Sequence, residues 1–146
     1  MKILICTLQL GLNYGGILQA FALNRYLREA GVDAKTFIDH RHQKSFKGYL
    51  RRILECIPFH NISGIKNDKI KRQRLLTFVD SHIPILKSNG KSLNDVIRFE
   101  SIDVLVIGSD QVWREAYNRD VRSNFLPKRL EISNIVSYAA SFGESP

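Results

Sequence analysis

The sequence predicts an α/β fold whose mostly parallel sheet is doubly wound, and three observations indicate this class. Short apolar runs typical of buried strands alternate with segments of helical periodicity. The chain of 146 residues has the length of one domain, with apolar and charged fractions of 44% and 25%, as in globular proteins. No internal repeat or low-complexity linker divides it. We therefore expect a single Rossmann-like domain over residues 1–146.

The first elements read as strand, helix, strand. Residues 2–7 form an apolar run typical of a buried strand, and a polar, glycine-containing loop follows. A helix is expected from about residue 16 to residue 30, because Gly31 is a natural helix stop. Its first turns carry no polar face, so we expect the start of this helix to be deeply buried. Residues 32–38 read as a second strand, which the crossover helix makes parallel to the first.

A basic, helical segment over residues 41–89 then interrupts the pattern, and we expect it to be a variable insertion. Helices are predicted near residues 45–57 and 66–82. A short extended piece follows at residues 83–86, where Pro84 disfavours helix at the preceding residue.

The pattern of strands resumes in the last third of the chain. A short helix is predicted from Ser92 to about residue 100. Residues 102–107 form the strongest strand, stopped by Gly108, and residues 132–140 form another. A strand followed by a glycine turn usually leads into a further helix, so we expect the chain to be the first part of a longer protein.

The formal net charge of +8 is concentrated in residues 41–74. This segment holds ten of the 22 basic residues and two of the 14 acidic ones, so it carries the whole net charge. Nucleic-acid binders often have such a stripe, but neither interleaved exposed aromatics nor a reading motif accompanies it, and no nucleic-acid partner is expected. Apolar residues at helical spacing over 46–57 lie opposite basic ones. This helix either lies on an anionic membrane surface or packs on the domain with its basic face in water.

Several kinds of site and location are excluded by what the sequence lacks. No apolar run approaches the ~20 residues of a membrane span and no signal-peptide pattern occurs, so we expect a cytoplasmic protein. Cys6 and Cys56 are too few for a disulfide framework or a zinc site. His40 and His42 have no third ligand nearby, so neither a metal nor another cofactor is expected. The nucleophile elbow, the dinucleotide fingerprint and the P-loop are all missing.

Three polar segments each directly follow a predicted strand. They are residues 13–20, 108–113 and 138–143. In a parallel sheet the carboxyl ends of all strands share one edge, and ligands bind there where the strand order reverses. We therefore expect the three segments to meet at one rim and to form a pocket.

The first segment has two interpretations. Gly15 and Gly16 open the first helix, so unpaired backbone N–H groups and the positive end of the helix dipole can receive an anion there. Asn13 and Gln19 add side-chain donors. Alternatively, the paired glycines only allow a tight turn from strand to helix.

The second segment carries the candidate catalytic carboxylate. Asp110, between Ser109 and Gln111, can act as an acid or base or bind a sugar hydroxyl, although an Asp or Ser at this position also commonly caps the next helix. Trp113, the only tryptophan, either stacks on a sugar ring or fills the core.

At these segments the sequence resembles the polysaccharide pyruvyl transferase family. The resembling residues are Asn13 to Gly16 with Leu18 to Ala20 and Ala22 to Leu23, Asp103 to Trp113, and Ser137 to Gly143. The resemblance implies transfer of the enolpyruvyl group of phosphoenolpyruvate to a sugar of a surface polysaccharide, or of its lipid-linked precursor, to form a ketal. It also implies two Rossmann-like domains facing a cleft, as in glycosyltransferases of the B type, with this chain as the first.

The resemblance also implies which residues line the acceptor side of that cleft. They are Asn13, Tyr14, Gly15, Gly16, Gln19, Gly108, Ser109, Gln111, Trp113, Ser141 and Gly143, with Asp110 as the catalytic residue. The implied partners are phosphoenolpyruvate and a saccharide acceptor, with peripheral membrane contact through residues 41–74. Two alternatives stay open: a two-domain glycosyltransferase that uses a nucleotide sugar, and a non-catalytic α/β module that docks through the basic segment.

Overall fold

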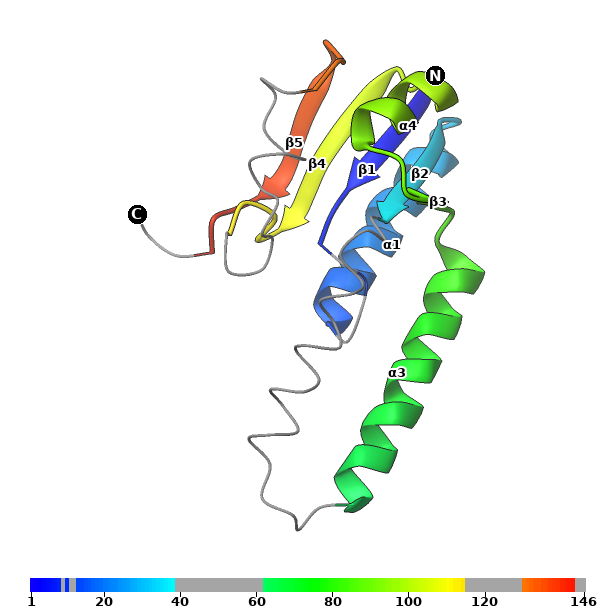
Figure 1. Ribbon diagram of the computed structural model, residues 1–146, viewed down its shortest axis with the longest axis vertical. Helices are drawn as coiled ribbons and strands as arrows, with labels where there is room; N and C mark the ends of the chain where they lie inside the picture. Colours follow the sequence, from blue (N-terminus) through cyan, green and yellow to red (C-terminus); the bar gives the residue numbers. More distant parts are fainter. Residues whose placement is uncertain (9, 11–12, 39–61, 115–129, 144–146) are drawn as a thin grey trace.

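The computed structural model describes residues 1–8, 10, 13–38, 62–114 and 130–143 (Figure 1). The strands in these ranges are β1 (Lys2–Cys6), β2 (Asp33–Ile38), β3 (Ile85–Lys87), β4 (Val104–Asp110) and β5 (Ile135–Ala140). The helices are α1 (Tyr14–Glu29), α3 (Ile62–His82) and α4 (Leu93–Glu100).

The five strands form one sheet in the order β3-β2-β1-β4-β5, and every neighbouring pair is parallel. The chain runs outward from β1 to β3, returns past β1 by way of α4, and continues outward from β4 to β5. The strand order therefore reverses between β1 and β4, the topological switch point of a doubly wound sheet. The predicted α/β class is confirmed, and the sheet is entirely parallel where the sequence predicts a mostly parallel one.

The central strands are buried on both faces because alternate residues point to opposite sides and helices cover each side. The cluster on the first face contains Ile3, Ile5, Ala34 and Val106, with Leu23 and Leu27 of α1 packed against it. The cluster on the second face includes Leu4, Leu105 and Ile107 with Leu93, Val96 and Ile97 of α4. α1 and α4 thus lie on opposite faces of the sheet (Figure 1).

α1 begins at Tyr14, two residues before the predicted start, because Asn13 caps it. The Asn13 side chain accepts a hydrogen bond from the backbone N–H of Gly16 at 3.3 Å. The helix ends just before Gly31, whose φ of +81° is the left-handed conformation expected of a glycine stop.

The first turns of α1 are buried on one side only, so the prediction of a deeply buried start is wrong. Ile17 and Ala20 are buried, but Leu18 is 56% exposed and Ala22 is also exposed. A helix buries only the stripe that faces the strands and the neighbouring helix, so apolar residues on its outward side stay accessible. Sequence composition alone does not distinguish the two sides.

Part of the predicted insertion over residues 41–89 belongs to the regular fold. α3 begins at Ile62, four residues before the predicted start, and ends at His82 as predicted. β3 follows and pairs with β2, so β2, α3 and β3 form an ordinary parallel crossover. The predicted helix near residues 45–57 lies outside the described residues. No helix in the described part of the chain is long and apolar enough to cross a membrane.

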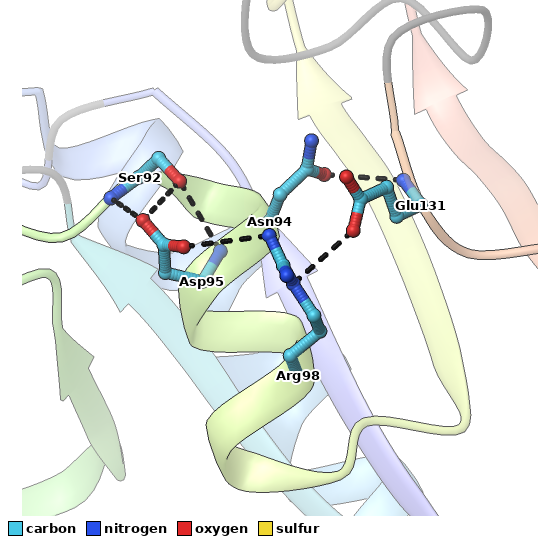
Figure 2. Close-up of polar contacts among 5 residues, drawn as sticks. All are labelled: Ser92, Asn94, Asp95, Arg98 and Glu131. Atoms are coloured by element: carbon cyan, nitrogen blue, oxygen red, sulfur yellow. Dashed lines mark hydrogen bonds and ion pairs between the residues drawn. The ribbon is translucent and has the colours of Figure 1, made fainter.

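α4 begins at a capping box centred on Ser92 (Figure 2). Oγ of Ser92 accepts a hydrogen bond from the backbone N–H of Asp95 at 3.2 Å, and Oδ2 of Asp95 accepts one from the backbone N–H of Ser92 at 3.1 Å. Hydrogen bonds from the Ser92 side chain and backbone hold the pKa of the Asp95 carboxyl group below its usual value. The reciprocal bonds explain why the helix begins where the sequence predicts.

The exposed side of α4 contacts the segment that leads into β5. Nε of Arg98 lies 3.1 Å from a carboxylate oxygen of Glu131. Oδ1 of Asn94 accepts a hydrogen bond from the backbone N–H of Glu131 at 3.1 Å (Figure 2). β5 then begins at Ile135, three residues later than predicted. These contacts link α4 to the chain just before its last described strand.

Candidate functional site

The candidate site lies at the carboxyl ends of β1 and β4, where the strand order reverses. Cys6, the last residue of β1, pairs with Ile107 of β4, so β4 continues three residues beyond the end of β1. The loop after β1 leads to Asn13 and the start of α1, while β4 runs on to Asp110. Ligands of doubly wound folds bind at this place in the sheet.

β4 extends three residues beyond its predicted end at Ile107. Gly108 does not stop the strand but lies opposite Tyr138 of β5. A Cβ atom at position 108 would overlap the carbonyl oxygen of Tyr138, and φ is +123° there, so this close approach requires glycine. Ser109 and Asp110 are therefore held as the last two residues of a central strand.

The first and second polar segments meet through Asn13 and Asp110. Nδ2 of Asn13 donates a hydrogen bond to Oδ2 of Asp110 at 3.3 Å, while Oδ1 of Asn13 caps α1. A Cβ atom on Gly16 would lie 3.3 Å from the Asn13 amide nitrogen and 3.6 Å from Oδ2 of Asp110. A side chain at position 16 would therefore press on the Asn13 amide but would make only ordinary contact with the Asp110 carboxylate.

Ser109 lies behind the rim, where it ties β4 to α1. It is 2% exposed, and its Oγ donates a hydrogen bond to Oε1 of Gln19 at 2.8 Å. The Oγ1 of Thr7, just after β1, donates to the carbonyl oxygen of Ser109 at 3.4 Å. Ser109 and Gln19 therefore help to hold the end of β4 in position.

The second and third segments meet through the backbone. The N–H of Ser141 donates to the carbonyl oxygen of Asp110 at 3.0 Å, and the N–H of Trp113 donates to the carbonyl oxygen of Ser141 at 3.2 Å. The rings of Trp113 and Phe142 lie 5.3 Å apart and are tilted by 41°. Trp113 is half-buried against the core cluster on the α4 side, so the ring has both core contacts and an accessible part. The predicted meeting of the three segments at one rim is thus confirmed.

Gly143 and Gln111 lie in close contact on the same side of the rim. A Cβ atom on Gly143 would overlap the Gln111 side chain, and φ at Gly143 is +76°. Gln111 also accepts a hydrogen bond through Oε1 from Nη1 of Arg114 at 3.0 Å. The left-handed φ at position 143 favours glycine there, and a larger residue would displace the Gln111 side chain.

Among the described candidate residues, Asp110 is the one non-glycine residue with a positive φ. Its φ is +75°, a left-handed conformation that side chains other than glycine, asparagine and aspartate rarely adopt. Its carboxylate is partly accessible. Among the described residues, Asn13 donates the hydrogen bond that Oδ2 accepts, and Oδ1 accepts none. Non-glycine residues in such conformations cluster at functional sites.

Two cations near these segments were not among the predicted site residues. Arg114 contacts Gln111. It directly follows the segment that resembles the family, so its place in the sequence could have identified it as a candidate site residue. Lys71 of α3 places its Nζ 4.7 Å from the centre of the Tyr14 ring. No sequence pattern connects Lys71 to the rim, because only the packing of α3 on α1 brings it there. The described residues contain no group of three or more His, Cys, Asp or Glu that could hold a metal ion.

A comparison with protein-family models decides the family. The model described as polysaccharide pyruvyl transferase matches residues 13–146. The chain belongs to the polysaccharide pyruvyl transferase family. The match begins at Asn13, the residue that caps α1 and contacts Asp110, and it includes all three polar segments. No curated protein and no solved structure gives a significant match to this chain.

Proposed function

We propose that this member of the family is a pyruvyl transferase domain that binds the sugar acceptor at the rim between β1 and β4, with Asp110 as the general base. The reaction transfers the enolpyruvyl group of phosphoenolpyruvate to a sugar of a surface polysaccharide or of its lipid-linked precursor. The observation that carries the proposal is the Asp110 carboxylate, presented at the switch point of the sheet and bonded to Asn13 at the start of α1.

The chemistry of ketal formation requires groups that handle hydroxyl protons. One sugar hydroxyl oxygen bonds to C2 of phosphoenolpyruvate, and the C3 methylene gains a proton and becomes a methyl group. A second hydroxyl oxygen then bonds to C2 as phosphate leaves, and the proton of that hydroxyl departs to a base or with the phosphate. A carboxylate within hydrogen-bond reach of the attacking hydroxyl can accept its proton. Asp110 has an oxygen, Oδ1, that accepts no hydrogen bond from the described residues.

The electrostatics at the start of α1 favour the acceptor over the donor at this position. The N-terminus of a helix attracts anions, but here the Asp110 carboxylate already lies near Gly16. A second anion at the same place, such as phosphoenolpyruvate, would be repelled, whereas a neutral hydroxyl would not. We therefore assign the donor to the opposite side of the cleft, on the facing second domain that the family architecture implies.

The same proposal indicates further residues that contact the sugar and the place of the reaction. Trp113 is half-buried, so the accessible part of its side chain can contact a sugar, as can Gln111 two residues before it. Tyr14 and Gly15, at the exposed start of α1, are further candidate contacts. We place the reaction in the cytoplasm, where phosphoenolpyruvate is available as donor.

The test is the Asp110→Asn substitution in the full-length protein. Asparagine keeps the shape of the side chain and tolerates the left-handed backbone, but it cannot accept a proton. We expect transfer of label from isotopically labelled phosphoenolpyruvate into the acceptor polysaccharide to fall by about 100-fold or more. The matched control is Asp33→Asn, because Asp33 begins β2 at the opposite end of the sheet; it should retain full transfer.

Normal transfer in the Asp110→Asn variant would remove Asp110 from the reaction. Titration of the full-length protein with phosphoenolpyruvate and with nucleoside diphosphate sugars tests the reaction itself. Binding of a nucleotide sugar in place of phosphoenolpyruvate would identify a glycosyltransferase and overturn the proposal. Binding of neither would favour a non-catalytic module.

A further inference from the structure

A groove of about 640 Å³ runs between α1 and α3, away from the sheet. Figure 1 shows the two helices side by side, with α3 extending well beyond the sheet. Six of its lining residues carry the argument: Tyr14, Leu18, Ile70, Lys71, Arg74 and Phe78. The floor is the apolar cluster that joins the two helices, which contains Ile17, Leu75 and Val79.

The walls of this groove are apolar and accessible. Leu18 is 56% exposed, Ile70 is 51% exposed and Tyr14 is 48% exposed. Single exposed apolar side chains are common on protein surfaces, but here three of them line one concavity above a buried apolar floor. A concavity of this kind fits an elongated apolar group.

The charges at the groove are positive. Lys71 and Arg74 lie three residues apart on α3, so they are on the same side of the helix. Nζ of Lys71 is held 4.7 Å from the centre of the Tyr14 ring. Among the described residues that line the groove there is no acidic side chain. The groove therefore combines an apolar surface with two cations, which complements an amphiphile that carries a negative head group.

The groove begins at the candidate site. Tyr14 lines the groove, and Asn13, the preceding residue, donates the hydrogen bond to Asp110. A ligand whose anionic group is paired with Lys71 and Arg74 of α3 would thus lie beside Tyr14, one residue along the chain from Asn13. A sugar attached to that anionic group can extend towards the carboxylate at the rim.

We propose that the groove between α1 and α3 binds the lipid-phosphate part of a lipid-linked saccharide acceptor. The lipid chain lies on Leu18, Ile70 and Phe78, and the phosphate lies at Lys71 and Arg74. The identity of the saccharide as acceptor rests on the proposed function, whereas the lipid-phosphate site does not depend on the reaction.

The probe that tests the groove is dodecyl phosphate, used below its critical micelle concentration and titrated into the full chain by calorimetry. We expect saturable binding at one site. Inorganic phosphate, which lacks the chain, and dodecyl maltoside, which lacks the charge, should each bind at least tenfold more weakly. Equal binding of dodecyl maltoside would show that the cations are not used and would overturn the proposal.

The variants Lys71→Glu, Arg74→Glu and Leu18→Gln should each weaken dodecyl phosphate binding by about tenfold. The matched control is Arg28→Glu, a charge reversal in the last turn of α1 and outside the groove, which should change binding less than twofold. Circular dichroism checks that each variant is folded. Binding that none of the groove variants weakens would place the ligand elsewhere and overturn the proposal.

Other occupants of the groove give different results. If another part of this chain or a second copy covers the groove, dodecyl phosphate will not bind, and sedimentation velocity will separate a dimer from a monomer. If the groove contacts a bilayer surface instead, anionic phosphatidylglycerol vesicles will bind the chain while monomeric dodecyl phosphate will not. Either result overturns the proposal.

The two proposals fail separately. Asp110→Asn should abolish transfer and leave dodecyl phosphate binding unchanged. Lys71→Glu should weaken dodecyl phosphate binding and reduce transfer to a lipid-linked acceptor, while transfer to the same saccharide without its lipid is retained. Loss of both properties in both variants, with each variant folded by circular dichroism, would show that the two sites are not separate and would overturn the groove proposal.

Discussion

At the scale of single residues, Asp110 combines an accessible carboxylate with a strained backbone. Its φ of +75° lies where an alanine is unfavourable but where Asn and Asp are tolerated. The neighbouring Asn13 contributes a hydrogen bond at 3.3 Å. Substitutions at this position therefore act on both stability and chemistry, and the choice of replacement determines which effect is measured.

The stability part can be isolated by comparing Asp110→Ala with Asp110→Asn. We expect Asp110→Ala to lower the free energy of unfolding by about 1–2 kcal/mol relative to Asp110→Asn, because alanine lacks the local polar group that stabilises left-handed φ. Urea unfolding followed by circular dichroism measures the difference. Equal stability of the two variants would show that the backbone at this position is not strained. For this reason Asp110→Asn is the cleaner test of catalysis.

At the scale of secondary-structure elements, the caps decide where the helices begin. Asn13 sets the first residue of α1 and Ser92 sets the first residue of α4. In α1 the cap residue is also part of the candidate site, since the other end of its amide contacts Asp110. The cap of α4 is remote from the rim and can be tested for stability alone.

The α4 cap predicts a pH dependence of stability. Hydrogen bonds from Ser92 lower the pKa of Asp95 in the folded protein, so the ionised carboxylate stabilises the fold. This contribution is fully present above the pKa of the unfolded chain, and it is lost as the pH falls through the lower pKa of the folded state. The difference in melting temperature between the wild type and Asp95→Asn should thus be present near neutral pH and vanish in strong acid. A difference that persists in acid would contradict this origin.

At the scale of the whole molecule, the candidate site is assembled from segments that are far apart in the chain. Asn13 reaches Asp110, and Gln19 reaches Ser109, across about 90 or more intervening positions. The parallel sheet makes this possible, because it brings the carboxyl ends of β1 and β4 side by side. The geometry of the rim therefore depends on the packing of α1 against the sheet.

This long-range tie can be measured by a double-mutant cycle on Gln19 and Ser109. The hydrogen bond of 2.8 Å from a buried hydroxyl predicts a coupling free energy of about 1 kcal/mol between Gln19→Ala and Ser109→Ala. The matched control pairs Gln19→Ala with Ser88→Ala, since Ser88 is buried near the end of β3. The control pair should be additive. Additivity of the first pair would show that the contact does not hold the strand end.

In the described part of the chain, local sequence patterns predicted the helices, four of the five strands and their order, while residues 83–86 were expected only as a short extended piece. Apolar runs located β1, β2 and β4, and the residues before α4 identified its start. The parallel order then implied that three polar segments share one edge, because parallel strands all point their carboxyl ends the same way. Local patterns and strand topology are therefore sufficient to predict which segments meet at the rim. Resemblance at the same segments indicated the family, which the family model then confirmed.

Which side chains of those segments are accessible, and which neighbours they have, depends on tertiary packing. Gly108 was expected to end a strand, yet it continues β4 because its missing side chain admits the backbone of β5. Ser109 is buried, Leu18 is exposed, and Lys71 lies over Tyr14. Each of these depends on how one element packs on another. Local sequence patterns record the periodicity within an element, whereas burial and contact between elements arise from packing, which residues distant in the chain determine together.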